Sequence, residues 1–277
     1  MPNKPLPAYI VDAFTNKAFG GNPAAVCILN NTRTDQWLQQ VAAEFNLSET
    51  AFLLQEKDNR WNLRWFTPTC EIKLCGHATL AATHVLLNEL KLPYSTIVFS
   101  SLSGDLQATI HDVKNAAQIK LDFPRIFCNK IDQVSAAINA LGLKQVGAYS
   151  AGEDIILELA DEADVLNYHP DFVAVSNITT IRGLIITAKS ATLERDFVSR
   201  FFAPSIGINE DPVTGAAHCS LADLWSKKLG KNNLRAEQLS TRRGILDLVV
   251  HDKRVELIGS CVTILKGELV LKGDTNL

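Results

Sequence analysis

The sequence predicts a duplicated protein in which two similar domains each combine several strands with a helix that starts at a glycine turn. Two segments share a near-identical strand signature of an arginine, two aromatic residues, a small residue and a proline: 64–68 and 200–204. Each is followed by a turn and a helical pattern, beginning at Gly76 and Gly215. The arginines are 136 residues apart (200 − 64) and the glycines 139 (215 − 76). Two copies at so long a spacing indicate a duplicated domain and not a solenoid.

Chain length agrees with two domains. At 277 residues the chain is near the upper size for one hydrophobic core, and the duplication favours two domains of roughly 130 residues. We place them at residues 1–122 and 123–277, with the hinge from Pro124 onward. The C-terminal strand is a candidate to return to the first domain. Hydrophobic residues at 47% and charged residues at 21% are those of an ordinary globular protein.

The charge pattern excludes several classes of partner. A net charge of −3, a pI near 6.1 and the lack of any lysine or arginine cluster argue against a nucleic-acid or anionic-membrane surface. No segment approaches the roughly 18 apolar residues that span a bilayer, and the N-terminus lacks the apolar stretch of a signal peptide. The six cysteines form no Cys-x-x-Cys pair, so we expect reduced thiols in a cytoplasmic protein. The expected partner is a small molecule.

Apolar runs between turn signals predict the strands. In order they are 8–14, 24–29, 51–55, 61–66, 96–101, 106–110, 117–123, 154–159, 183–187, 197–202, 244–250, 254–258 and 261–271. Helical spacing of apolar residues predicts helices from Thr34, a good N-cap residue, to Asn46, and over 76–90, 134–142 and 215–230. Segments 164–166 and 171–176 are expected to surround one short helix or turn. Segment 19–23 is rich in glycine but lacks the Gly-Lys-Ser/Thr ending of a P-loop, so we interpret it as a turn.

The two glycine turns are candidate anion sites. A helix N-terminus offers backbone N–H groups and a partial positive charge, which suit a carboxylate. Small residues at Gly76 and at Gly215-Ala216 allow the backbone to approach a ligand closely. Two duplicated domains would most economically present these helices to one substrate across a cleft.

Glu49 is the candidate proton carrier. It leads the otherwise apolar strand run 51–55, where a carboxylate is costly unless it is paired or its pKa is shifted. We expect burial to raise its pKa, which would suit a general base at neutral pH. A structural alternative is a capping box formed with Asn46, but that motif precedes a helix and here a strand follows.

His77 and Asp211 stand beside the two glycine turns. The helix dipole would lower the pKa of His77 and favour a neutral ring that hydrogen-bonds the substrate. The alternatives are a histidine that caps or packs against its helix, and an aspartate that only stabilises a helix start. The other histidines, at 84, 111, 169, 218 and 251, share no metal spacing with a carboxylate or thiol.

Two mechanisms remain open from the residues alone. Paired thiols can remove and return a proton beside a carboxylate, and Cys75 is one candidate thiol. The second turn, 212–215, has no cysteine, and Cys219 lies a full helical turn beyond Gly215. In the other mechanism the carboxylate of Glu49 carries the proton.

Several ordered motifs resemble the phenazine-biosynthesis (PhzF-like) isomerase family. They are Asp-Ala-Phe at 12–14, Gly-Asn-Pro-Ala at 21–24, Ser-Glu-Thr-Ala-Phe at 48–52, Cys-Gly-His-Ala-Thr at 75–79 and Glu-Asp-Pro-Val-Thr-Gly-Ala-Ala-His at 210–218. The resemblance runs from about residue 8 to the end. It implies the α+β diaminopimelate-epimerase-like fold: two pseudo-symmetric domains, each a mostly antiparallel sheet rolled around a central helix, with the active site in the interdomain cleft.

The resemblance also implies the roles of single residues. Glu49 corresponds to the family's proton shuttle, His77 and Asp211 to substrate-orienting groups, and Gly76, Gly215 and Ala216 to the backbone anion site. Founding members often have serine where this chain has Ala216. The implied activity is a cofactor-independent and metal-independent isomerisation of a small anionic substrate, amino-acid-like or cyclic dihydroaromatic, by a homodimer. A cysteine-assisted epimerase or racemase and a catalytically silent binding protein of the same fold are the alternatives.

Overall fold

The computed structural model of the chain describes residues 5–112 and 118–270. Its strands are β1 (Leu6–Ala13), β2 (Asn22–Leu29), β3 (Glu49–Lys57), β4 (Arg60–Phe66), β5 (Glu71–Ile72), β6 (Thr96–Ser101), β7 (Gly104–Asp112), β8 (Gln118–Pro124), β9 (Asn129–Lys130), β10 (Gln145–Ala151), β11 (Asp154–Leu159), β12 (Gly183–Lys189), β13 (Phe197–Ala203), β14 (Ile208–Asp211), β15 (Asn233–Gln238), β16 (Gly244–Val250), β17 (Arg254–Gly259) and β18 (Cys261–Leu269). Its helices are α1 (Asp35–Phe45), α2 (Gly76–His84) with the π-helix η1 (Val85–Glu89), α3 (Ala136–Asn139), α4 (Glu162–Asn167), α5 (Phe172–Ser176), the 3₁₀-helix η2 (Pro204–Ile206) and α6 (Gly215–Leu229).

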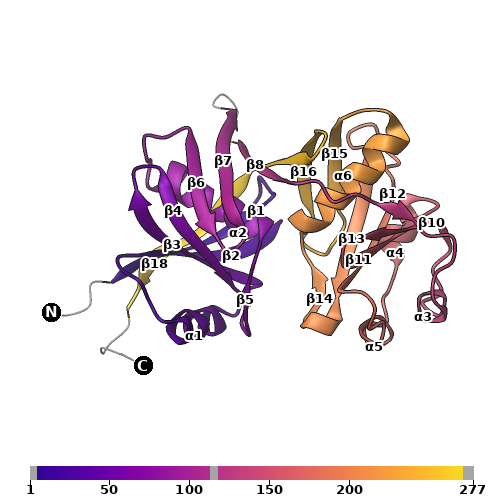
Figure 1. Ribbon diagram of the computed structural model, residues 1–277, viewed down its shortest axis with the longest axis horizontal. Helices are drawn as coiled ribbons and strands as arrows, with labels where there is room; N and C mark the ends of the chain where they lie inside the picture. The colour runs from indigo at the N-terminus through magenta and orange to yellow at the C-terminus, as the bar shows by residue number, and fades with distance from the viewer. Residues whose placement is uncertain (1–4, 113–117, 271–277) are drawn as a thin grey trace. The chain divides into compact units, whose positions relative to one another are not determined.

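The chain divides into two compact units. Unit 1 contains Met1–Asp122 and Ile258–Leu277, and unit 2 contains Phe123–Leu257. Unit 1 is therefore discontinuous in sequence. Its last strand, β18, is antiparallel to β1, pairing Leu6 with Leu269 at one end and Ala13 with Cys261 at the other. In Figure 1 this strand, in yellow, lies among the indigo and magenta strands of unit 1.

The same strand pairing occurs in both units. In unit 1, β1–β2 is antiparallel, β2–β3 parallel, β3–β4 antiparallel, β4–β6 parallel and β6–β7 antiparallel. In unit 2, β10–β11, β11–β12, β12–β13, β13–β15 and β15–β16 repeat that series in the same order and sense. This confirms the predicted duplication and a mostly antiparallel α+β fold.

One buried helix fills each unit. All nine residues of α2 are buried, and so are eleven of the fifteen in α6. A helix buried on every side belongs in a core and not on a surface. In unit 1, α2 packs against β1, β2, β3 and β18, and in unit 2, α6 packs against β15 and β16. Figure 1 shows α2 among the strands of unit 1 and α6 beside β15 and β16.

Peripheral helices cover the outer face of each sheet. In unit 1, α1 buries Trp37 and Leu38 against a cluster that includes Phe52 and Phe66. The rings of Phe52 and Phe66 meet edge to face, with centroids 5.6 Å apart. In unit 2, α4 and α5 pack Val165 and Val175 onto the strand cluster around Phe202. Each sheet therefore has a core on both faces.

Most predicted elements are confirmed, two predicted helices differ, and several strands were not predicted. The predicted helix over 134–142 is wrong in extent, because only Ala136–Asn139 is helical. The helix predicted over 76–90 ends as a π-helix over Val85–Glu89. Strands β5, β9, β10, β14 and β15 were not predicted. Position 117, predicted to begin a strand, lies outside the described residues. No helix among residues 5–112 and 118–270 has the length and apolar character that crossing a bilayer requires.

Candidate active site

Strand register brings the predicted residues of unit 1 together. Strands β2 and β3 run parallel, with Ala24 opposite Glu49, so both strands begin at the same edge of the sheet. Asn22 is the first residue of β2, and Glu49 is the first residue of β3. The contacts below show that α2 begins at this edge with Cys75, Gly76 and His77. The predicted proton carrier and the first glycine turn are therefore neighbours.

Glu49 and His77 form a buried pair. Nε2 of His77 lies 2.9 Å from Oε2 of Glu49, and the two residues are only 4% and 6% exposed, respectively. The distance is that of an ion pair, but the atoms are not aligned as a hydrogen bond, because Oε2 is a buried atom without a hydrogen-bond partner. The capping-box alternative for Glu49 is excluded, since Asn46 ends α1 in the left-handed conformation and Glu49 is in a strand.

The pKa expected for His77 is wrong in direction. Burial lowers the pKa of His77, but the neighbouring Cys75 and the Glu49 carboxylate outweigh it and hold that pKa well above its usual value. The sequence prediction considered only the helix dipole, which amounts to about half an elementary charge. A carboxylate 2.9 Å from the ring carries a full charge at closer range.

Asn22 fixes the other side of the His77 ring. Its Nδ2 lies 3.1 Å from His77 Nδ1, in the interior of unit 1. As placed, the amide donates to Nδ1 of a neutral ring and leaves the Nε2 proton facing Glu49. Rotated by half a turn, the same amide would accept from Nδ1–H of a charged ring. An amide is suited to hold the ring in either state.

Cys75 lies against the His77 ring in surroundings that disfavour its thiolate. Its Sγ lies 3.5 Å from Nδ1 of His77 and 4.0 Å from Nε2. Burial, and after it the charge of Glu49, raises the pKa of Cys75. Because the thiolate is the reactive form, this surrounding disfavours Cys75 as a base.

Both central helices begin without a side-chain cap. In the described residues, the four peripheral α-helices are all capped, since Thr34, Ser135, Asp161 and Asp171 accept hydrogen bonds from first-turn N–H groups. At α2 and α6 the N-cap residues Cys75 and Thr214 make no such bond. An uncapped helix start keeps N–H groups for another acceptor.

The turn before α6 has a buried hydrogen-bond network. Oγ1 of Thr214 donates to Asp211 Oδ2 over 2.5 Å, so the N-cap hydroxyl serves Asp211 and not the helix. Gln238, on β15, accepts from the backbone N of Thr214 over 2.8 Å and donates to the carbonyl of Asp211 over 2.6 Å. Asp211 is 7% exposed and ends β14. Gly215 is buried and Ala216 is half-buried in the first turn of α6.

Two other histidines have structural contacts. His218 is fully buried one turn into α6, donates from Nδ1 to the Thr214 carbonyl over 2.8 Å and stacks on Phe197. Burial lowers the pKa of His218 to about 4. His84 Nε2 lies 3.0 Å from Thr263 Oγ1 of β18.

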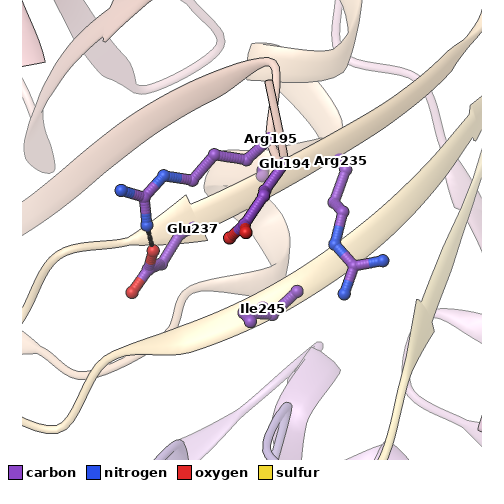
Figure 2. Close-up of a pocket in the computed structure, with 6 residues that line it drawn as sticks. Glu194, Arg195, Arg235, Glu237 and Ile245 are labelled. Atoms are coloured by element: carbon purple, nitrogen blue, oxygen red, sulfur yellow. Dashed lines mark ion pairs between the residues drawn. The ribbon is translucent and has the colours of Figure 1, made fainter. Parts of the chain in front are cut away.

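A surface hollow of unit 2 contains none of the predicted residues. It has a volume of about 360 Å³ and is lined by charged side chains of both signs. Figure 2 shows Arg195 facing Glu237 there, with Glu194 and Arg235 beside them. Arg195 also pairs with Glu162 over 2.7 Å. These charged side chains largely pair with one another within the protein, so the hollow is lined by internal ion pairs.

The fold is the one found in epimerase-like and racemase-like structures. Two solved structures with little sequence similarity share the fold. One is a predicted epimerase from Pseudomonas aeruginosa, 18% identical with a TM-score of 0.73 over 96% of this chain and 99% of that one. The other is a probable proline racemase from Agrobacterium radiobacter, 10% identical with a TM-score of 0.66 over 98% and 94%. The predicted fold class is confirmed.

The chain belongs to the phenazine biosynthesis-like family, whose model matches residues 11–267. An uncharacterized isomerase of Halalkalibacterium halodurans is 44% identical over 96% of this chain and 98% of that one. The human phenazine biosynthesis-like domain-containing protein is 38% identical over 95% and 99%. A PhzF-family crystal structure from Enterococcus faecalis is 42% identical, with a TM-score of 0.90 over 97% and 100%. The chain is thus a small-molecule isomerase, as predicted.

Sequence reasoning missed two residues of these networks. Asn22 had a weak signal, because it follows Gly20-Gly21 in a turn and is polar at the start of an apolar strand. Gln238 had no signal, since it lies 27 residues from Asp211 and meets it only through the fold.

Proposed function

We propose that this isomerase moves a proton on a small anionic substrate, amino-acid-like or cyclic dihydroaromatic, with Glu49 as general acid and base and without a cofactor. The buried contact between Glu49 Oε2 and His77 Nε2, 2.9 Å apart, carries the proposal. Oε2 lacks an aligned donor, so it can accept a proton from substrate carbon and return it to another carbon. His77 stabilises the carboxylate between these transfers.

The start of α2 supports the choice of an anionic substrate. With no side-chain cap at Cys75, the N–H groups of Gly76 and His77 suit a substrate carboxylate. An anion held there would place the neighbouring carbon beside Glu49, since His77 contacts the Glu49 carboxylate. Proximity of this kind lowers the barrier by reducing the entropy lost on reaction.

We assign a parallel binding role to Asp211, Gly215 and Ala216 in unit 2. The uncapped start of α6 and the hydrogen-bonded turn before it support that role. Where founding members often have a serine, Ala216 offers only its backbone N–H. Asp211→Asn is expected to weaken substrate binding without stopping proton transfer, because Glu49 remains in place.

The thiol mechanism is the weaker alternative. Cys75 is buried with a raised pKa, and the matching turn at 212–215 has no cysteine. Cys75→Ala therefore separates the two mechanisms. It should leave proton exchange within about tenfold of wild type if Glu49 is the shuttle, and it should abolish exchange if the thiol is.

Deuterium wash-in tests the proposal. Purified protein is incubated in heavy water with a metabolite extract and candidate cyclic and linear amino acids, and incorporation is read by mass spectrometry. Wild type should label one compound, and Glu49→Gln should lower that rate by about 10² to 10⁴. Glu44→Gln, at an exposed position on α1, is the matched control and should exchange like wild type. Exchange that survives Glu49→Gln would contradict the assignment.

We further propose that the chain works as a cytoplasmic homodimer. The family resemblance supports the dimer, and six free cysteines suit a reducing compartment. Light scattering should give twice the chain mass of 30.4 kDa. A monomer at micromolar concentration would contradict it.

A further inference from the structure

We propose that Glu49 Oε2, Cys75 Sγ and His77 Nε2 form a binding site for a soft divalent cation, with Zn²⁺ the ion that fits it best, and that the bound ion blocks proton transfer. One donor atom from each of the three residues lies within 4.8 Å of the other two, and all three residues are buried. A thiolate, an imidazole and a carboxylate are the donors that zinc takes in proteins, and three protein ligands leave the fourth position open. The inhibition rests on the proposed function, whereas the binding rests on the geometry.

The distances fit a tetrahedral ion after small side-chain shifts. Metal–ligand bonds of 2.0 to 2.3 Å place neighbouring donors roughly 3.3 to 3.6 Å apart. Nε2 is 2.9 Å from Oε2 and 4.0 Å from Sγ. The Nε2–Oε2 distance must therefore lengthen, and the Nε2–Sγ distance must shorten, by about half an ångström each. Rotations of the Glu49 and Cys75 side chains suffice for such changes.

Asn22 supplies the outer partner that a zinc-bound imidazole requires. A ligand histidine nearly always donates its second N–H to an oxygen. When the metal occupies Nε2, the proton of His77 is on Nδ1, and the Asn22 amide lies 3.1 Å from that atom. A half-turn of the amide presents Oδ1 as the acceptor.

Binding is an exchange of protons for the ion. The Cys75 thiol releases its proton to solvent as sulfur takes up the cation. A charged His77 ring releases its Nε2 proton and keeps the one on Nδ1, a neutral ring moves its proton from Nε2 to Nδ1, and Glu49 binds through Oε2. No electron is transferred. The carboxylate oxygen that would accept the substrate proton then lies on the metal, so the ion acts as an inhibitor and not as a cofactor.

Cobalt titration of the full-length chain tests the site without any substrate. Protein dialysed against a chelator is titrated with Co²⁺, whose thiolate complexes absorb in the near ultraviolet and whose tetrahedral complexes absorb strongly in the visible. We expect one Co²⁺ per chain with both signals, displaced by Zn²⁺. Cys75→Ala should lose the ultraviolet band, while Cys219→Ala, another buried cysteine outside this cluster, should keep it.

Asn22, the hydrogen-bond partner of the metal-bound His77 ring, gives a second readout. Asn22→Ala should weaken Zn²⁺ binding by about 10-fold to 100-fold while the thiolate band persists. Circular dichroism confirms that each variant is folded. Absence of the thiolate band in folded wild type, or its survival in Cys75→Ala, overturns the site.

Deuterium exchange then tests inhibition separately. Saturating Zn²⁺ should stop exchange in wild type, and chelator should restore it. Full exchange with the cobalt site occupied overturns the inhibition but leaves the isomerase assignment intact. Metal binding in a chain whose Glu49→Gln variant still exchanges would contradict the role of Glu49 as proton carrier and leave the metal site intact.

Discussion

At the scale of single residues, the two buried acids of the candidate site each lie beside a polar partner that the fold supplies. Glu49 faces His77 in unit 1, and Asp211 faces Thr214 in unit 2. An amide side chain contacts each pair: Asn22 contacts His77 in unit 1, and Gln238 contacts Asp211 in unit 2. Amides carry both donors and acceptors, so they can complete such networks without adding charge.

Gln238→Ala should destabilise the protein by about 2 to 5 kcal/mol, because it leaves the Thr214 N–H and the Asp211 carbonyl buried without a partner. Urea unfolding measures the change. The control Gln40→Ala, on the exposed face of α1, should stay within about 0.5 kcal/mol of wild type. Equal effects from both substitutions would show that the 211–214 turn does not depend on Gln238.

His218 should make unfolding pH-dependent. Its pKa is about 4 in the folded protein against about 6.5 when unfolded. Between these values the unfolded chain binds the extra proton, so stability rises with pH there. The full contribution, about 3 kcal/mol, is present above pH 6.5 and is lost as pH falls toward 4.

Urea unfolding at several pH values across this window measures that slope. His218→Asn should flatten the slope, whereas His251→Asn, at an exposed position, should leave it unchanged. An unchanged slope in His218→Asn would assign the acid sensitivity to other groups.

At the scale of elements, the sequence predicted those helices and strands whose ends depend on residues close by in the chain. Helix α1 has Thr34 as its N-cap and left-handed Asn46 as its C-cap, and both were readable in the sequence. Strand β15 was missed because its residues alternate weakly and its place depends on parallel pairing with β13. The contact of Glu49 with His77 depends in the same way on β2 and β3 starting at one sheet edge.

Packing beneath α2 should tolerate no added methyl at Gly259. A Cβ there would meet Phe14 Cδ1 at 2.5 Å and Leu80 of α2 at 3.1 Å. We expect Gly259→Ala to cost about 1 to 3 kcal/mol through overpacking. Gly267→Ala is the matched control on β18, where the nearest atom is 3.7 Å away. Thermal unfolding compares the two, and equal melting temperatures would show that Phe14 moves aside freely.

At the scale of the whole molecule, the two units differ in how the chain completes them. Unit 2 is the continuous segment 123–257, whereas unit 1 needs residues from 258 onward. A chain ending at 257 lacks β18 and exposes the edge of β1. We expect that truncated chain to lose the cooperative unfolding of unit 1. The segment 123–257 expressed alone should give dispersed amide NMR signals, and a collapsed spectrum would refute its independence.

Because unit 1 is discontinuous in sequence, its sheet is completed late during synthesis in the cell. When the ribosome has made β1 to β8, the first sheet still lacks its final strand, and making the 123–257 segment takes roughly 10 to 30 seconds. Throughout that time the nascent first unit presents an open strand edge, a known template for aggregation. The later-made unit is therefore the first that can finish folding. The fold that encloses Glu49 and His77 is completed only after β18 has been made.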